Sequence, residues 1–299
     1  MDFDRSEEVV FMIARLRSGV KYLFGKDIAG RNLRTYPDDT FLTSYTKSGN
    51  TWTRFLVASL IHCEEPMTLV KADEFIPSTT RSHKALKAVP RPRILKSHYP
   101  FDPNYRRVIY IVRDPKDVAV SQYHFKIKCK LIPDGYPMEE FIASFVRGDA
   151  TSYGSWGEHV GSWLAARLGD PEFLLIRYED LHRQTDVEVI RIANFLGIDP
   201  TPQRIRWAIE QSTAERMRKL EQTEAGRWGS TKDTRKDKSF FRSAKSGDGR
   251  TMLSGQHIAQ IESAWGPLMR WLGYETASGA SNNTEDASFV ETVLQRPSR

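Results

Sequence analysis

The chain has 299 residues with 44 basic and 38 acidic side chains, so its formal net charge is +6 and its pI is near 9.2. This surplus favours an anionic partner, and the length suits one large α/β domain or two modest ones. Two cysteines, Cys63 and Cys129, are too few for a disulfide framework and favour a reducing compartment, so we expect a cytoplasmic protein. The acidic first residues and short apolar runs argue against a signal peptide and a membrane span.

The first predicted elements are a helix, a strand and a second helix. An amphipathic helix is expected from Val9 to Leu23, and weak alternation predicts a buried strand over Thr40–Tyr45. From Thr51 the apolar residues fall on one helical face. A tight loop at Thr46–Asn50 therefore joins the strand to the second helix.

The middle of the chain predicts two further strands. Arg93–Lys96 is a short strand bounded by prolines, and Arg107–Val112 is apolar almost throughout, as in a strand covered on both faces. The second strand leads into a helix that begins at Pro115 and ends near Phe125, because proline suits the first turn of a helix.

The remaining regular pattern continues the alternation of helices and strands. Apolar stripes over Met138–Val146 and Trp156–Leu168 predict helices, Phe173–Ile176 predicts a strand, and Asp186–Leu196 predicts a helix that Gly197 can cap. Such alternation predicts an α/β fold, with a mainly parallel central sheet flanked by helices.

Two segments lack such a pattern. Residues 226–250 are rich in basic side chains, glycine, serine and threonine, and we expect a long mobile loop there. Residues 277–299 are rich in serine, asparagine and alanine, and we expect disorder. The chain is therefore interpreted as one domain over residues 1–276 followed by a tail.

Cationic and hydroxyl side chains follow the predicted strands. Lys47 to Trp52 follow the first strand, Lys96 and His98 end the second, and Arg113 and Tyr178 follow the third and fourth. Ligands of parallel α/β sheets bind at the carboxyl ends of the strands. A Ser-Gly turn that leads into a helix offers backbone N–H groups to an anion, although this loop is not a Walker A motif.

These segments resemble the cytosolic sulfotransferases, which use 3′-phosphoadenosine-5′-phosphosulfate (PAPS). Thr43–Trp52 resembles their 5′-phosphosulfate loop, and Arg107–Ser121 resembles their 3′-phosphate segment. Lys96-Ser97-His98 stands where the family has Lys-Thr-His, and Phe173–Asp180 resembles another strand. The resemblance runs from about Tyr36 to Tyr274 and implies the P-loop-like sulfotransferase fold.

The resemblance implies three catalytic residues. His98 is expected to take a proton from the acceptor hydroxyl or amine, and Lys47 to stabilise the bridging oxygen of the departing phosphosulfate. Lys96 is expected to stabilise the sulfuryl oxygens. The reaction is then an in-line transfer without a covalent enzyme intermediate and without a metal.

The resemblance also implies a co-substrate site for PAPS. Arg113, Ser121 and Arg242 are expected at the 3′-phosphate, and Trp52 is expected to stack on adenine. The residues implied to bind PAPS are Lys47, Ser48, Gly49, Asn50, Thr51, Trp52, Arg113, Ser121, Tyr178, Ser212, Met217 and Arg242.

The sequence departs from the family pattern at four positions. Ala214 replaces an aromatic residue expected at adenine, while Ser243, Ala244 and Gly249 replace the Lys, Gly and Trp of the family's closing loop. The dimerisation motif of the animal enzymes is not recognisable, so the resemblance implies no oligomeric state.

Two other functions compete with sulfuryl transfer. A nucleotide kinase of related topology would use ATP and magnesium, but a Walker lysine motif and a clear metal-binding aspartate are missing. A nucleic-acid-binding protein would account for the basic charge, but its aromatics do not interleave with basic residues in a recognised motif. We therefore expect a small, partly apolar, hydroxylated acceptor as the partner, with no nucleic acid and no membrane.

Overall fold

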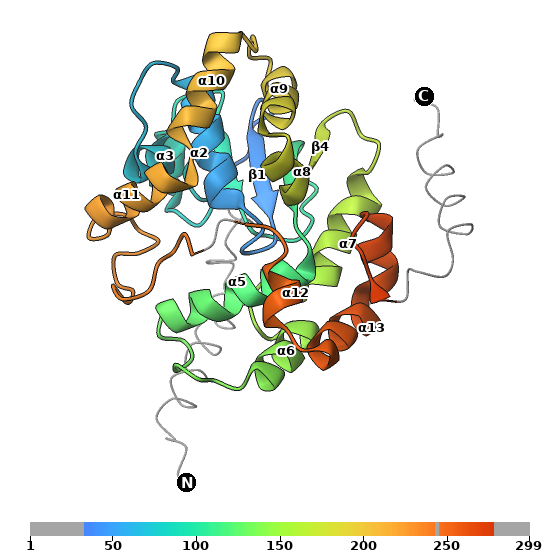
Figure 1. Cartoon of the computed structure of the whole chain (residues 1–299). Coiled ribbons are helices and arrows are strands. Elements are labelled where there is room, and N and C mark those ends of the chain that lie inside the picture. The colour runs from blue at the N-terminus through green and yellow to red at the C-terminus, as the bar shows by residue number, and fades with distance from the viewer. Residues whose placement is uncertain (1–32, 243–244, 278–299) are drawn as a thin grey trace.

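The computed structural model describes residues 33–242 and 245–277, in which four parallel strands form one sheet (Figure 1). The strands are β1 (Thr40–Ser44), β2 (Ile94–Ser97), β3 (Arg107–Val112) and β4 (Phe173–Arg177), in the order β2-β1-β3-β4. Each neighbouring pair is parallel. The predicted strands and the mainly parallel sheet are confirmed, with boundaries within about one residue.

Helices connect the strands and cover both faces of the sheet. They are α2 (Asn50–Ile61), α3 (Leu69–Phe75), α4 (His83–Lys87), α5 (Pro115–Lys128), α6 (Met138–Arg147), α7 (Trp156–Arg167), α8 (Tyr178–Arg183), α9 (Thr185–Leu196), α10 (Pro202–Gln211), α11 (Ala214–Glu224), α12 (Asp248–Met252) and α13 (Gly255–Trp271). The helices predicted between residues 51 and 196 are confirmed, and Gly197 ends α9 with φ 71°.

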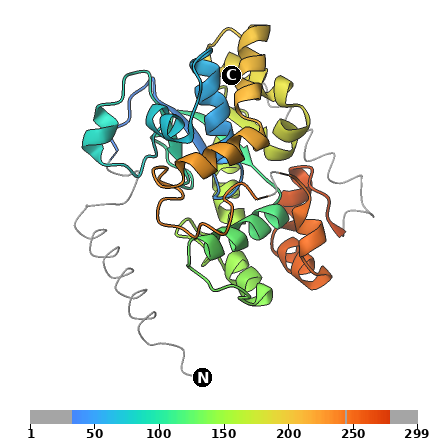
Figure 2. The same ribbon diagram turned by 60° about the vertical axis from the view of Figure 1, so that its left-hand side comes forward.

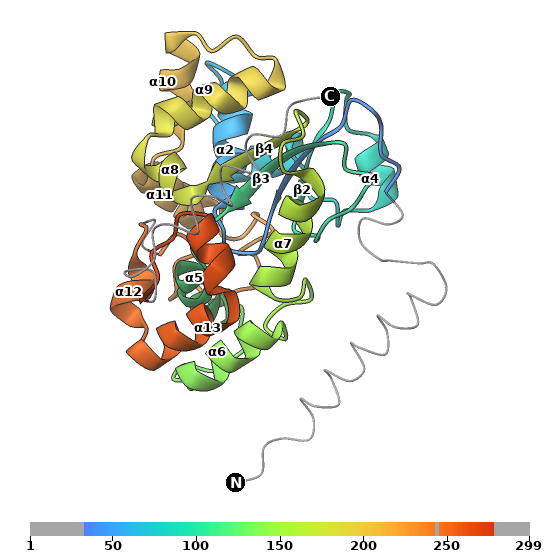
Figure 3. The ribbon, with the colours of Figure 1, turned by 90° about the vertical axis from the view of Figure 1, so that its right-hand side faces the viewer.

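Two apolar cores lie on opposite faces of the sheet. Alternate residues of β3 divide between them, because successive side chains of a strand point to opposite faces: Ile109 packs with α2 and α9, while Tyr110 packs with α5, α6 and α7. Figures 1 and 3 show α2, α9 and α10 gathered on one side and α5, α6 and α13 on the other. The carboxyl ends of the strands open between these two groups.

The segment from residue 226 to 250 differs from the patternless loop that we predicted. Trp228 in this segment is fully buried, and α12 begins at Asp248, so the prediction is wrong at its end. A five-residue helix is too short to show a period. Figure 2 shows the orange segment between α11 and the green helix α5. The predicted helix Val9–Leu23 and all but the first residue of the predicted tail lie outside the described residues.

Candidate active site

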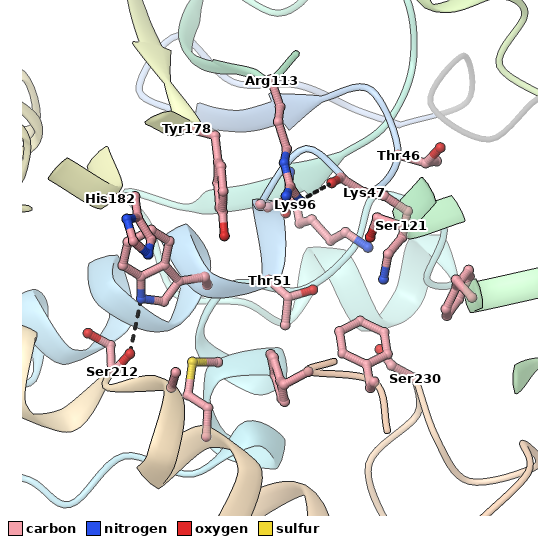
Figure 4. A pocket seen from close by; sticks show the side chains of 18 of the residues that line it. Thr46, Lys47, Thr51, Lys96, Arg113, Ser121, Tyr178, His182, Ser212 and Ser230 are labelled. Atoms are coloured by element: carbon pink, nitrogen blue, oxygen red, sulfur yellow. Dashed lines mark hydrogen bonds between the residues drawn. The ribbon is translucent and has the colours of Figure 1, made fainter. Parts of the chain in front are cut away.

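The residues that follow the four strands meet at one cavity of about 610 Å³. This volume lies within the range of pockets that hold a nucleotide-sized ligand. Figure 4 shows Lys47 and Ser121 at one end and His182 and Ser212 at the other. The predicted site residues that line the cavity are Lys47, Gly49, Asn50, Thr51, Trp52, Lys96, His98, Arg113, Ser121, Tyr178, Ser212 and Met217. Two predicted residues, Ser48 and Arg242, are not among its lining residues.

The loop between β1 and α2 forms a cradle in which position 49 requires glycine. Gly49 has φ +100°, and a Cβ added there would lie 2.4 Å from Cδ2 of Tyr178. No side chain caps the N-terminus of α2, and its first turn carries no acidic residue. The first backbone N–H groups of a helix attract anions, so this turn can accept a phosphate or sulfate group.

Two polar side chains of the loop, those of Ser48 and Asn50, are buried. The Asn50 side-chain amide donates hydrogen bonds to the Leu42 carbonyl and the Ser44 hydroxyl, which ties the start of α2 to β1. Ser48 is fully buried, and its hydroxyl has no hydrogen-bond partner among the described residues. The loop therefore presents its backbone, rather than the Ser48 side chain, to the cavity.

Lys47 holds its ammonium between two aromatic rings. Its Nζ lies 4.4 Å from the ring centroid of Phe125 and 4.1 Å from that of Phe240. Burial and the neighbouring Arg113 lower the pKa of Lys47 to about 7. An anionic ligand at the loop would favour the charged form, so the site is suited to a group that carries negative charge.

Arg113 joins β3 to the segment before α12. Its guanidinium stacks 4.2 Å above the Tyr178 ring and donates to the Lys245 carbonyl at 2.9 Å. It also donates to Asp117, whose carboxylate accepts from the amides of Gly247 and Gly249. Lys245 thus contributes its backbone, and its exposed side chain does not line the cavity.

Gly249 allows α12 to lie directly on α5. A Cβ at this position would be 2.6 Å from the backbone carbon of Lys116. The glycine that replaces the family's tryptophan is therefore required by this close approach. The other two departures in the closing loop, at residues 243 and 244, lie outside the described residues.

Arg242 pairs away from the cavity. Its guanidinium forms an ion pair with Asp248 and donates a long hydrogen bond to Sδ of Met252. The side chain is 34% exposed. The structure thus brings Arg113 and Ser121 together at the cavity, but it does not bring Arg242 to them.

His98 is held in one orientation at the end of β2. Its Nδ1 lies 2.8 Å from the Ser44 carbonyl, an acceptor, so Nδ1 carries the hydrogen and Nε2 keeps its lone pair. The backbone carbonyl of His98 accepts from Nε2 of His159, whose Nδ1 accepts from the Tyr110 hydroxyl. Burial, followed by the charge of Lys96, lowers the pKa of His98 well below its ordinary value. The imidazole is therefore neutral and able to accept a proton.

Lys96 places a second ammonium near His98 and Lys47. Burial, followed by the charge of Arg54, lowers the pKa of Lys96 to about 7. Tyr153 also lines the cavity, and its ring lies 5.9 Å from that of His98. A base, a cation and an aromatic wall thus lie together.

The far end of the cavity has flat and apolar walls. The Trp52 indole donates to the Ser212 carbonyl at 3.0 Å, which fixes its plane, and Tyr178 and His182 meet it edge-on. Ala214 and Met217 also line the cavity. Such a site suits the flat face of a nucleobase.

Several residues that line the cavity were not predicted from the sequence. They are Thr46, Phe125, Tyr153, His182, Thr185, Ile209, Thr213, Ser230, Phe240 and Phe241. His182 lies on α8 one turn after Tyr178, and only this position could have indicated the cavity.

The part of the chain that the structure describes holds neither a metal-binding cluster nor a membrane-spanning helix. The described residues contain no group of three or more His, Cys, Asp or Glu side chains placed to hold a metal ion. Within the same ranges, no helix is long and apolar enough to cross a bilayer.

Comparisons with known proteins agree with this arrangement. The sulfotransferase domain family matches residues 37–273. Sulfotransferase 1B1 of Canis lupus familiaris is 31% identical over 243 residues, which cover 76% of this chain and 80% of the relative. Flavonol 3-sulfotransferase of Flaveria bidentis is 28% identical over 266 residues, which cover 81% and 85%.

A solved structure shares the fold. Retinol dehydratase in complex with androsterone and the inactive cofactor PAP superimposes with a TM-score of 0.69 at 24% identity, covering 86% of this chain and 87% of that one. The family match spans most of the chain, and the cavity lies where three of the four parallel strands deliver Lys47, Lys96 and Arg113. The chain therefore belongs to the sulfotransferase family and is a PAPS-dependent sulfotransferase.

Proposed function

We propose that the cavity seats PAPS with its phosphosulfate over the Lys47–Trp52 loop, and that the acceptor meets it beside His98. The observation that carries this proposal is the 2.8 Å contact between His98 Nδ1 and the Ser44 carbonyl. That contact leaves Nε2 as the basic atom of a residue that shares one cavity with Lys47 and Lys96.

The donor set of the cavity fits a nucleotide with two anionic groups. The uncapped turn at Gly49 would hold the 5′ group by backbone N–H donors, and the Thr51 hydroxyl would add another. Arg113 and Ser121 would hold the 3′-phosphate, the arginine by paired donors. Arg242 is kept as a proposed third ligand, which would exchange its partner Asp248 for the phosphate.

The nucleobase would lie at the flat end of the cavity. Trp52 would stack on adenine, with Tyr178, Ser212 and Met217 around it. The hydrogen bond from the Trp52 indole to the Ser212 carbonyl supports this role, because a fixed ring plane is a better stacking surface than a mobile one.

Sulfuryl transfer would proceed by positioning and electrostatics. His98 Nε2 would take the acceptor proton, which raises the nucleophilicity of the attacking oxygen or nitrogen. Lys47 would stabilise charge on the oxygen that leaves with the nucleotide, and Lys96 would stabilise the sulfuryl oxygens. No covalent enzyme intermediate and no metal are proposed.

The proposed acceptor is a small molecule with a hydroxyl or amine on a partly apolar body. Phe125 and Tyr153 support this assignment, since both line the cavity and the Tyr153 ring approaches His98. Aromatic walls favour an apolar body, while the neutral imidazole favours a protic group at its end.

Two experiments test this proposal. Calorimetric titration should show adenosine 3′,5′-bisphosphate (PAP) binding, with ATP plus magnesium and single-stranded RNA as comparison ligands. Turnover should then be followed by mass spectrometry with PAPS and a panel of phenols, aliphatic alcohols and amines. Tighter binding of ATP plus magnesium than of PAP would contradict the proposed donor site.

A further inference from the structure

A buried ion pair lies outside the groups that the proposed mechanism uses. Glu221 of α11 and Lys128 of α5 are 7% and 3% exposed, and Lys128 Nζ lies 3.4 Å from Oε1 of Glu221. The segment 235–241, here called the strap, runs between the two helices (Figure 2) and hydrogen-bonds to both side chains of the pair.

The strap satisfies both charges with its own polar groups. Glu221 accepts from the backbone amides of Phe240 and Phe241, at 2.6 and 3.1 Å, and from the Ser239 hydroxyl at 3.0 Å. Lys128 donates to two strap carbonyls, those of residues 235 and 238, at 3.0 and 2.6 Å. Burying an ion pair is costly unless such hydrogen bonds satisfy it. The pair therefore fixes the backbone of the strap.

The fixed strap delivers Phe240 to Lys47. The ring centroid of Phe240 lies 4.1 Å from Lys47 Nζ, and that of Phe125 in α5 lies 4.4 Å from the same atom. Behind the strap, the fully buried Trp228 packs against Phe240 with ring centroids 4.9 Å apart. One ring of this cation–π pair thus belongs to a helix, and the other depends on the strap.

We propose that Glu221 and Lys128 are positioning residues for sulfuryl transfer, because they hold the strap so that Phe240 fixes the ammonium of Lys47 in the cavity. This inference rests on the proposed role of Lys47 at the leaving oxygen. Cation–π contacts at desolvated sites orient a cation, and an error of about 1 Å in a catalytic group costs roughly 100-fold in rate.

The strap also contributes to the burial of Lys47, because the Phe240 ring covers its ammonium. Burial is the largest cause that lowers the pKa of Lys47, followed by the charge of Arg113 and opposed by Cys129 and Glu221, while Lys128 adds a smaller lowering. Lys96 lies near enough to interact with the same ammonium. Loosening the strap admits water, so the pKa of Lys47 rises toward its ordinary value.

The test compares two glutamates of one helix. Glu221→Gln removes the charge and places an amide group opposite the strap N–H groups, whereas Glu215→Gln changes a glutamate of α11 that is 79% exposed. We expect Glu221→Gln to lower kcat about 10- to 100-fold and to weaken PAP binding less than it lowers kcat. Glu215→Gln should match the wild type in both.

The pH profile supplies a readout that a merely structural role would not move. In Phe240→Leu the alkaline fall of kcat/KM should shift to higher pH, because a hydrated Lys47 keeps its proton longer. In Glu221→Gln the shift should be smaller, because the lost carboxylate itself raises the pKa of Lys47. Phe240→Tyr should restore most of the rate since it keeps a ring, and an unshifted profile in Phe240→Leu would overturn the inference.

A measurement on the wild type covers the case in which Glu221→Gln fails to fold. Hydrogen exchange should find the amides of Phe240 and Phe241 strongly protected, and exchange at the rate of an unstructured peptide would overturn the inference. The proposed function is judged separately, by PAP binding to the wild type and by loss of kcat in Lys47→Met. Equal kcat in Glu221→Gln and Glu215→Gln would reject only the role of the pair.

Discussion

The Tyr178 ring packs directly on the backbone of Gly49, where an added Cβ would lie 2.4 Å from the ring. This contact joins the end of β4 to the loop after β1. Gly49 also has φ +100°, a region that other residues adopt only with strain.

Gly49→Ala should therefore destabilise the protein and weaken PAP binding. The backbone conformation alone costs roughly 1–3 kcal/mol, and displacement of Tyr178 adds to it. Thermal unfolding and calorimetry measure the two effects. Gly161→Ala in α7 is the control, since no atom lies within 4 Å of its added Cβ, and it should stabilise the helix by about 0.5–1 kcal/mol.

His98→Ala should lower kcat by about 100-fold or more while the affinity for PAP stays nearly unchanged. The substitution removes the proposed proton acceptor but none of the proposed donor contacts. Steady-state kinetics and calorimetry on one preparation separate the two quantities. His83→Ala, at an exposed histidine of α4, should behave as the wild type. Weaker PAP binding with unchanged kcat would reject His98 as the base.

Arg113→Ala should weaken PAP binding by about 10- to 100-fold, because a charge-assisted hydrogen bond contributes roughly 1.5–3 kcal/mol. AMP lacks the 3′-phosphate, so its affinity should hardly change. The PAP affinity of Arg113→Lys should lie between those of the wild type and Arg113→Ala, since lysine keeps the charge but not the paired donors. Equal weakening of PAP and AMP would show that Arg113 does not serve the 3′-phosphate.

The dependence of kcat/KM for PAPS on pH should be bell-shaped in the free enzyme. The base acts when neutral, so activity falls as pH drops through the pKa of His98, which burial places well below 6.5. The cations act when protonated, so activity falls as pH rises through the pKa values of Lys47 and Lys96, both about 7.

The kcat profile checks the same assignment in the complex. Bound PAPS is anionic and favours the charged lysines, so the alkaline limb of kcat should lie at higher pH than that of kcat/KM. An acidic limb above pH 6.5 in kcat/KM would contradict the buried, neutral state of His98.

The sequence predicted the sheet well because its strands are short apolar runs with clear ends. Arg107–Val112 was predicted with the bounds of β3, and the site followed from the polar residues after each strand. The helices α10 and α11 were missed although Thr201 and Thr213 cap them, since capping signals without a long apolar stripe are weak.

The strap pair could not be predicted from the sequence. Lys128 and Glu221 each look like an ordinary charge on a polar helix surface, and nothing local indicates that they meet. Arg242 illustrates the opposite case. Its place in the family pattern predicted that it lies at the cavity, whereas its side chain pairs with Asp248 and is not among the lining residues. The first outcome depends on a partner 93 residues away along the chain, and the second on an acidic residue six positions after Arg242.

Tyr153 belongs to the connection between α6 and α7, whereas Lys47, Arg113 and Tyr178 follow strands of the sheet. The wall beside His98 can therefore be rebuilt by changes in a surface connection while the sheet edge stays intact. Directed evolution toward new acceptors should draw its mutations from that connection, and related enzymes can diversify in the same way from one shared scaffold.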